Sequence, residues 1–512
     1  MQIVTRKEQS GHAVHPSTLD DTVFDGEAIP REISARAWLK EGVVHKSAIL
    51  TNALESTRFL CGPQVSLTRD DIRRTTWAGV VEANRLLLCE VSGQRPKGFP
   101  APRFDRVQVA EGDIWRYHLT LNKFTGKVSM LWVTRAMGTH HLWLDGIEVK
   151  TTAKTVDFPF MAFSQAAVGR IQQDEPDFAI MTYKCRDTGR LFWRRISNGE
   201  VGREAFLEVG QTVGGASIGI AKEKVVIRVD ELRSGKLVPT LVESDDGGKS
   251  FKKARALDLS GFERGFDVVP GCTAPTIDKG YGINIPVFAS NGKESVALNY
   301  VIARNMLVEA IRVNGARPKG SLEVFPSTLG SHQPYGNGVS DGHGLIMVLM
   351  TDGALYSSNS SAGGIHFPES AHLNREMPKI AAFDASECYS SGLHPNYVSM
   401  DYLYVEGDDR GRPISPVLHF ETWDMPLPVP KVTANSKGRE VMVDVLNDAD
   451  LESGKVVFSF DDPSINIVEV NVLDMRRAIV KTDSADLHGK TISFDVQTLF
   501  HRHYGEALIN EE

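Results

Sequence analysis

One unit recurs along this chain: two alternating strands joined by a short turn. The clearest copy reads KVVIRVD, ELRSG, KLVPTLVES over residues 224–244, and its alternation of apolar and polar residues is typical of a β-hairpin. Six further copies can be aligned with it, and their turns are 46 to 70 residues apart, with a mean of 59. The turn centres are Ser56, Thr125, Thr188, Ser234, Arg304, Gly353 and Arg410.

A repeat of this length predicts a β-propeller. A single four-stranded sheet cannot bury its apolar faces, whereas several sheets stacked around a channel bury them and protect the strand edges. The chain is therefore predicted to be all-β, with a seven-bladed β-propeller over residues 36–425. Six or eight blades are the alternatives, because two of the copies match weakly.

The segments on either side of the repeats have a different character. Residues 1–35 carry little pattern and are interpreted as an N-terminal arm that closes the propeller or docks against a neighbour. From Pro426 a proline-rich joint leads into short alternating strands, which predict a small C-terminal β-sandwich-like domain over residues 426–512. This domain is the candidate for oligomerisation.

Composition excludes several classes of protein. The 512 residues are 41% hydrophobic and 24% charged, as in soluble globular proteins, and the net charge of −8 argues against a general nucleic-acid binder. The five cysteines form no C-x-x-C pair, and no cofactor-binding motif is found, so neither a metal site nor a cofactor is predicted. No apolar run could span a membrane and no signal peptide is recognised, which predicts a cytoplasmic protein or one exported without a signal.

The stretch SDDGGKSF after the clearest hairpin has a fixed chemical logic. Its spacing, Ser244-x-Asp246-x-Gly248-x-Ser250-Phe251, matches the Asp-box S-x-D-x-G-x-[ST]-[WF]. The carboxylate of Asp246 is expected to accept hydrogen bonds from the turn, glycine permits a positive φ, and the aromatic ring packs between sheets. Asp246 is therefore predicted to stabilise the turn between the third and fourth strands of a blade, and not to take part in catalysis.

The hairpins together with the Asp-box resemble the sialidase-like (Asp-box, BNR-repeat) β-propeller superfamily over about residues 36–425. In blade number and in the hairpin RLFWRRIS the chain is nearer to seven-bladed polysaccharide lyases of the ulvan lyase type than to true sialidases. The resemblance implies a propeller that cleaves or binds carbohydrate. It transfers no catalytic residue, because the hairpin histidine of the lyases is replaced here by Arg186 or Asp187.

Arginine is frequent at the predicted hairpin turns, which are expected to gather at one mouth of the channel. A planar guanidinium group binds carboxylate or sulfate through two hydrogen bonds, so a ring of arginines suits an acidic ligand. The alternative for each arginine is a solvated pair with a neighbouring aspartate. The anion-binding candidates are Arg186, Arg233, Arg304 and Arg410, with Tyr281 from a separate loop.

Tyrosine and histidine are frequent in the segments interpreted as loops between blades. Abstraction and return of a proton require such groups, together with an arginine that neutralises an adjacent carboxylate. The alternative for each is an ordinary hydrogen-bonded loop residue. The proton-transfer candidates are His332, Tyr335, Tyr389 and His394, and the segment RAMGTHHLW adds Arg135, His140 and His141.

Two functions fit these residues. The first is a carbohydrate-active enzyme, a polysaccharide lyase or glycoside hydrolase, that cleaves a carboxylated or sulfated glycan by β-elimination or hydrolysis at the propeller mouth. The second is a non-catalytic glycan-recognition or structural propeller, for example of a cell surface or virion. Clustered arginine, histidine and tyrosine favour the first function, which we prefer. The missing signal peptide and the degenerate Asp-boxes of the other copies favour the second.

Overall fold

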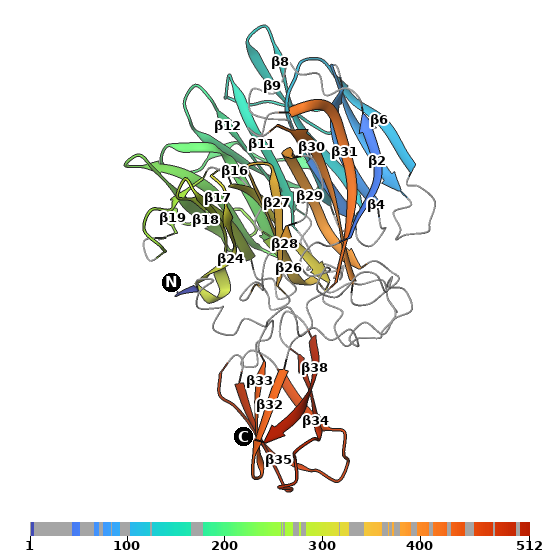
Figure 1. Ribbon diagram of the computed structural model, residues 1–512. Coiled ribbons are helices and arrows are strands. Elements are labelled where there is room, and N and C mark those ends of the chain that lie inside the picture. Colours follow the sequence, from blue (N-terminus) through green and yellow to red (C-terminus); the bar gives the residue numbers. More distant parts are fainter. Residues whose placement is uncertain are drawn as a thin grey trace.

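The computed structural model describes eight β-sheets and, among the described residues, no helix longer than the short 3-10 helix η4 (Ile302–Arg304). Seven sheets form the larger body in Figure 1 and the eighth forms a separate body at the C-terminal end. The described residues are 2–4, 43–51, 66–70, 75–82, 84–92, 103–122, 125–164, 178–257, 259, 262–269, 276–277, 283–316, 318–326, 342–360, 367, 371–372, 379–390, 397–408, 413–426, 432–445, 455–474, 477–497 and 502–511.

The first four blades follow the chain without interruption, each as a sheet of consecutive antiparallel strands. The first blade contains β3 (Ser66–Asp70), β4 (Thr75–Glu82), β5 (Arg85–Ser92) and β6 (Arg103–Glu111). The second contains β7 (Ile114–Asn122), β8 (Lys127–Ala136), β9 (Thr139–Leu144) and β10 (Ile147–Val149). The third contains β11 (Val156–Phe163), β12 (Phe178–Cys185), β13 (Leu191–Ser197), β14 (Glu200–Val201) and β15 (Ala205–Phe206). The fourth contains β16 (Thr212–Ala221), β17 (Lys224–Arg233), β18 (Lys236–Ser244) and β19 (Arg255–Ala256).

Of the remaining three blades, the fifth and the seventh each include a strand from the N-terminal part of the chain. The fifth contains β20 (Asp267–Val268), β21 (Thr276–Ile277), β22 (Ile283–Ser290), β23 (Glu294–Val301), β24 (Met306–Asn314) and β1 (Gln2–Val4). The sixth contains β25 (Pro318–Pro326), β26 (Gly342–Thr351), β27 (Ala354–Ser360) and β28 (Ala371–His372). The seventh contains β29 (Ile380–Ser390), β30 (Tyr397–Gly407), β31 (Pro413–Pro426) and β2 (Val43–Thr51).

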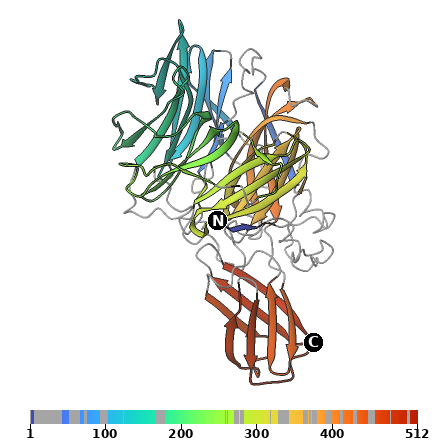
Figure 2. The ribbon, with the colours of Figure 1, turned by 90° about the vertical axis from the view of Figure 1, so that its left-hand side faces the viewer.

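The innermost strands of the seven blades contact one another in a closed ring, in the order β3, β7, β11, β16, β21, β25, β29 and back to β3. Figure 2 shows the sheets arranged side by side in this way, with the C-terminal sheet apart from them. The predicted seven-bladed β-propeller is therefore confirmed. Apolar side chains fill the spaces between blades because each strand is buried on both faces: Val225 and Ile227 of β17 pack toward the third blade, and Val226 packs toward the fifth.

The ring is closed by a strand from near the N-terminus. Strand β2 pairs antiparallel with β31, with Val43 opposite Asp424, and so forms the outer strand of the seventh blade. The hairpin turn predicted around Ser56 lies outside the described residues. The hairpin of the first blade is β4–β5, with Asn84 in its turn. Strand β1 adds to the fifth blade, parallel to β24.

The two ends of the blades form two distinct faces. We call one the tip face: it carries the turns between second and third strands and the links from one blade to the next. Backbone hydrogen bonds connect these two kinds of segment, since the amide of Gly315 donates to Lys293 and that of Ile380 donates to Gly353. Turns between first and second strands, and between third and fourth strands, lie at the opposite face because consecutive strands are antiparallel.

The segment Ser244–Phe251 forms the turn between β18 and β19, the third and fourth strands of its blade. Asp246 accepts hydrogen bonds from the Ser244 hydroxyl at 2.7 Å, the Ser250 hydroxyl at 2.6 Å, and the amides of Lys249 and Ser250 at 2.9 and 3.0 Å. These hydrogen bonds lower the pKa of Asp246 well below its usual range. The ring of Phe251 lies edge-on to Trp193 of the third blade, at 4.7 Å between centroids. The turn thus joins two blades.

Replacing Asp246 with alanine removes the acceptor for these four hydrogen bonds. We expect the free energy of unfolding to fall by about 1–3 kcal/mol, because the turn amides and hydroxyls lose their partner. Tryptophan fluorescence during urea unfolding measures this change in the propeller alone, because every tryptophan precedes residue 426. The matched control is Asp245→Ala, since Asp245 is exposed; equal effects of the two substitutions would contradict the role given to Asp246.

The C-terminal domain is one sheet in the order β34-β37-β38-β32-β33-β36-β35. Its core contains Val443, Val480 and Ile509, from the strands in the middle of this order. The strands of this domain are β32 (Val432–Lys437), β33 (Glu440–Val445), β34 (Lys455–Phe460), β35 (Ile467–Val472), β36 (Arg477–Thr482), β37 (Thr491–Gln497) and β38 (Arg502–Glu511).

No helix among the described residues has the length and apolar character needed to cross a membrane.

Candidate functional site

The innermost strands of the second, third and fourth blades are each irregular at their first residues, where they enter from the tip face. The pairing register shifts between Ile114 and Arg116 in β7, within residues 157–160 in β11, and within residues 213–216 in β16. A β-bulge redirects side chains and is frequent beside functional sites. These three bulges lie next to the channel, so the mouth of the channel on this side is the candidate site.

Trp115, at the bulge of β7, is surrounded by guanidinium groups. The guanidinium carbon of Arg135 lies 4.9 Å from the centroid of the indole ring, that of Arg186 lies 5.5 Å from it, and that of Arg116 lies 5.8 Å from it. An aromatic face attracts cations, which accounts for the position of each arginine separately. Three like charges around one ring nevertheless repel one another and require negative charge nearby.

Two aspartates supply part of that charge. Asp157 accepts a hydrogen bond from Nε of Arg116 at 3.0 Å, and its second oxygen lies 3.7 Å from Nε of Arg186. Asp113 accepts from Nε of Arg135 at 2.9 Å. We call Trp115, Arg116, Arg135, Asp157, Arg186 and Asp113 the Trp115 cluster. With three arginines and two aspartates, it carries one positive charge in excess, in a chain whose net charge is −8.

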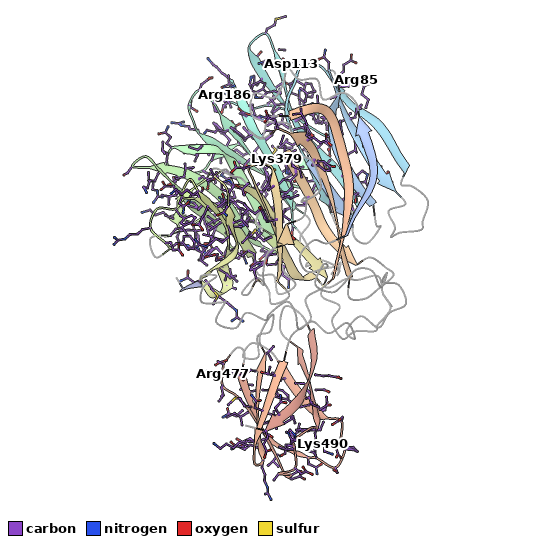
Figure 3. The ribbon with its side chains drawn as sticks, in the orientation of Figure 1. Arg85, Asp113, Arg186, Lys379, Arg477 and Lys490 are labelled. Carbon is purple, nitrogen blue, oxygen red and sulfur yellow. The ribbon has the colours of Figure 1, made fainter. Side chains whose placement is uncertain are left out.

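Burial divides the cluster into an anchor and a surface that can be reached by a ligand. The side chains of Arg116 and Asp157 are 12% and 6% exposed, whereas those of Arg135 and Arg186 are 45% and 54% exposed. Arg135 and Arg186 contact their aspartates through Nε. Within the described part of the chain, neither arginine donates a hydrogen bond from its two terminal amino groups, so these groups can bind an anion from solvent. Figure 3 labels Asp113 and Arg186 near the upper end of the propeller.

The backbone below the cluster is held in an unusual conformation. Phe158 has a φ of 49°, which is rare for a bulky residue, and its amide donates to the carboxylate of Asp157 at 2.9 Å. Gly215 of β16 permits this arrangement, because a Cβ atom there would lie 2.4 Å from Cβ of Phe158. The guanidinium of Arg116 in turn lies 5.2 Å from the Phe158 ring. Strain of this kind persists where the surrounding structure fixes a site.

The anion-binding candidates predicted from the sequence are divided between the two faces. Arg186 and Arg233 lie on the tip face, in the third and fourth blades. Arg233 donates to Glu231 at 2.6 Å, and Glu231 is buried, so this arginine is neutralised within its own strand. Arg304 lies in η4, between β23 and β24, which are the third and fourth strands of the fifth blade counted from the inner strand β21, and therefore on the opposite face. Thr125, between β7 and β8, lies there as well. Arg410 and Tyr281 lie outside the described residues.

The structure describes the side chain of none of the four proton-transfer candidates. His332, Tyr335 and His394 lie outside the described residues, and only the backbone of Tyr389 is described, in β29. Strand β29 starts on the tip face at Ile380, so Tyr389 lies about 30 Å further along it, at about 3.3 Å per residue. The described strand ends on either side of residues 327–341 and 391–396 also belong to the opposite face.

The two histidines predicted beside Arg135 have local partners. Nδ1 of His140 lies 2.6 Å from the carbonyl oxygen of Val156, and Nδ1 of His141 lies 2.7 Å from a carboxylate oxygen of Glu148. His140 stands beside Trp115, with 5.8 Å between ring centroids. His140 therefore supports the Trp115 cluster, whereas His141 points to the outer strand of the blade.

A tyrosine, an arginine and a glutamate meet on the outer side of the third blade, but their protonation is fixed. Tyr183 donates to Glu204, and Nε of Arg194 contacts the Tyr183 hydroxyl at 3.1 Å. Burial, followed by the hydrogen bond to Glu204, raises the pKa of Tyr183 to about 12. Burial would raise the pKa of Glu204, but hydrogen bonds from Thr151, Thr152 and Tyr183 outweigh it and lower the pKa to about 2. These shifts are opposite to those that proton transfer near neutral pH requires.

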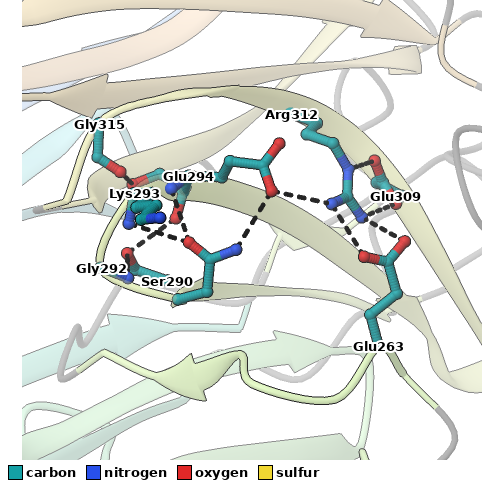
Figure 4. A network of polar contacts seen from close by, with 10 residues as sticks. Glu263, Ser290, Gly292, Lys293, Glu294, Glu309, Arg312 and Gly315 are labelled. Atoms are coloured by element: carbon teal, nitrogen blue, oxygen red, sulfur yellow. Dashed lines mark hydrogen bonds and ion pairs between the residues drawn. The ribbon is translucent and has the colours of Figure 1, made fainter.

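A second charged cluster of the tip face, in the fifth blade, has the opposite balance (Figure 4). Arg312 contacts three carboxylates, those of Glu309 at 2.8 Å, Glu263 at 3.0 Å and Glu294 at 3.8 Å. The hydrogen bond to Glu309 is the main reason why the pKa of Arg312 is raised. One arginine against three glutamates leaves this cluster with an excess of negative charge, which is the opposite of the balance in the Trp115 cluster.

Comparisons with known proteins were made for the whole chain. No family model matches it, and no curated protein matches it. Among solved structures, the polysaccharide lyase Uly1 is 8% identical, with a TM-score of 0.42, over 76% of this chain and 98% of that one. The Dos1 propeller is 11% identical, with a TM-score of 0.36, over 70% of this chain and 78% of that one. BBS1N from its complex with ARL6DN is 10% identical, with a TM-score of 0.36, over 76% of this chain and 98% of that one.

Proposed function

We propose that the protein recognises an acidic glycan, carboxylated or sulfated, at the tip face of its propeller. The observation that carries this proposal is the Trp115 cluster, where three guanidinium groups surround one indole ring and only two carboxylates of the cluster offset them. Arg135 and Arg186 would bind the acidic groups through their terminal amino groups, which match carboxylate and sulfate in geometry.

The anchor beneath them supports recognition by a rigid site. Asp157 holds Arg116 and approaches Arg186, and the Phe158–Gly215 contact fixes the backbone of β11. A site that is ordered before the ligand arrives loses less conformational entropy on binding. The turn at Asp246 has the spacing of an Asp-box and so resembles the turns of carbohydrate-active propellers. For this reason we propose a glycan as the ligand and not another kind of anion.

Recognition is preferred over cleavage for this site because of the placement of the titratable groups. Proton transfer would need His332, Tyr335, Tyr389 or His394, and the described strand ends next to these residues belong to the opposite face. On the outer side of the third blade, the raised pKa of Tyr183 keeps this residue protonated and the lowered pKa of Glu204 keeps that residue ionised, so neither exchanges a proton near neutral pH. Lyase or hydrolase activity is therefore the second candidate.

The test uses one polymer in two charge states. Polygalacturonate and its fully methyl-esterified form share a backbone, so calorimetric titration of the full chain with both measures the contribution of the carboxylates. We expect binding of the acid form only, and weaker binding as salt is added, because salt screens the interaction of exposed charges. Equal binding of both forms, or binding of neither this polymer nor a sulfated one, would refute the proposal. Product formation, followed by reducing ends and ultraviolet absorbance, would reveal cleavage.

A further inference from the structure

The C-terminal sheet ends at β35, whose outer edge pairs with no other strand among the described residues. Such an edge presents unpaired backbone groups, and proteins usually protect it with lysine, proline or a bulge. Strand β35 reads IVEVNV, contains neither lysine nor proline, and is exposed at four consecutive residues, 468–471. A bulge lies at its first residues, between Ile467 and Glu469, and beyond it the pairing with β36 is regular.

The order of residues in β35 is symmetric about Val470. In an antiparallel pair of two copies centred on this residue, Val470 would face Val470 of the second copy. Val468 would face Val472, and Glu469 would face Asn471. Each valine thus meets a valine and no two like charges are opposed, which is the pattern that stabilises neighbouring antiparallel strands.

We propose that the protein forms a two-fold symmetric dimer in which β35 of one copy pairs antiparallel with β35 of another. Val470 and Val472 lie beside Val480 and Ala478 of the buried core, so the pairing would extend this core across the dimer axis. A contact of this symmetry uses the same surface on both subunits, which limits the assembly to two copies. The other end of the sheet, β34, begins with Lys455 and lacks this symmetry.

Two opposite substitutions of one exposed residue test the pairing. Asn471→Glu would place two glutamates opposite each other at both ends of the dimer contact, and Asn471→Lys would create two Glu469–lysine pairs. Sedimentation velocity of the full chain over a range of concentrations should show a species of about twice 56.4 kDa. We expect the first substitution to weaken the dimer about five- to tenfold and the second to strengthen it by a similar factor.

Val457→Lys is the matched control, because Val457 is an exposed valine of β34 and the dimer should persist in this variant. The proposal would be overturned by a wild-type chain that is monomeric at every concentration. It would equally be overturned by shifts of the same sign for both Asn471 variants, or by loss of the dimer in the Val457 variant, which would place the contact at β34. None of these outcomes depends on glycan binding.

Discussion

Replacing Arg186 with alanine is expected to weaken binding of an acidic glycan about ten- to hundredfold. The side chain of Arg186 is more than half exposed, and its guanidinium group lies over Trp115 and contacts Asp157 only through Nε. Its hydrogen bonds to a carboxylate or sulfate would each contribute about 1.5–3 kcal/mol, and 1.4 kcal/mol corresponds to a factor of ten in affinity. Titration of wild-type and variant protein with the same oligogalacturonate gives the ratio directly.

The same turn provides a control for Arg186→Ala. Arg190 lies in the same turn but stacks over Phe206, with its guanidinium carbon 5.4 Å from the ring centroid, away from the Trp115 cluster. Arg190→Ala changes the net charge by the same amount and should leave the affinity within about twofold, since its only influence would be a distant, screened charge. If both variants lost affinity equally, a diffuse charge effect would replace the specific site.

The largest effect on stability is expected for Asp230→Ala. Asp230 and Arg228 are both buried in β17, where Nη2 of Arg228 lies 3.0 Å from the carboxylate of Asp230 and Nη1 donates to the carbonyl of Pro286 in the fifth blade. Removing the carboxylate leaves a buried guanidinium without its counter-charge. The free energy of unfolding of the propeller should fall by about 3–5 kcal/mol, measured by tryptophan fluorescence in urea.

Two further variants test whether the loss of stability comes from the unpaired buried charge or whether the propeller is destabilised by any loss of an aspartate. Asp267→Ala breaks an exposed ion pair with Lys236 and should cost about 1 kcal/mol or less. The double substitution Arg228→Met with Asp230→Val should be less destabilising than Asp230→Ala alone, because no unpaired charge remains buried. A double variant as unstable as the sum of its parts would show that the charges are not coupled.

The architecture could be predicted from the sequence because the period-two pattern and its recurrence report directly on repeated sheets. The position of each strand within a blade could not. Strands that follow one another directly in a blade are antiparallel and show the same alternation of residues. A hairpin of first and second strands around Thr125, or of third and fourth strands around Arg304, therefore has the same pattern as one of second and third strands. The partner of β2 is β31, and no local sequence pattern predicts a pairing between residues so distant in the chain.

The site was harder to predict than the fold. Arg186 was found because arginine at a hairpin turn stands out, but Trp115, Arg116 and Asp157 belong to inner strands and read as ordinary strand residues. They come together because they lie at the irregular starts of β7 and β11, two inner strands that neighbour each other in the ring. The neighbouring glycines in TVGG of β16 are the one local signal of such an irregularity, since adjacent glycines in a strand often mark a bulge.

The most direct test of the account is a structure of the full chain with a bound acidic oligosaccharide. The account predicts an acidic group of the sugar within hydrogen-bonding distance of the terminal amino groups of Arg135 and Arg186, on the tip face beside Trp115. An oligosaccharide bound at the opposite end of the channel, next to the strand ends that flank His332 and His394, would contradict it.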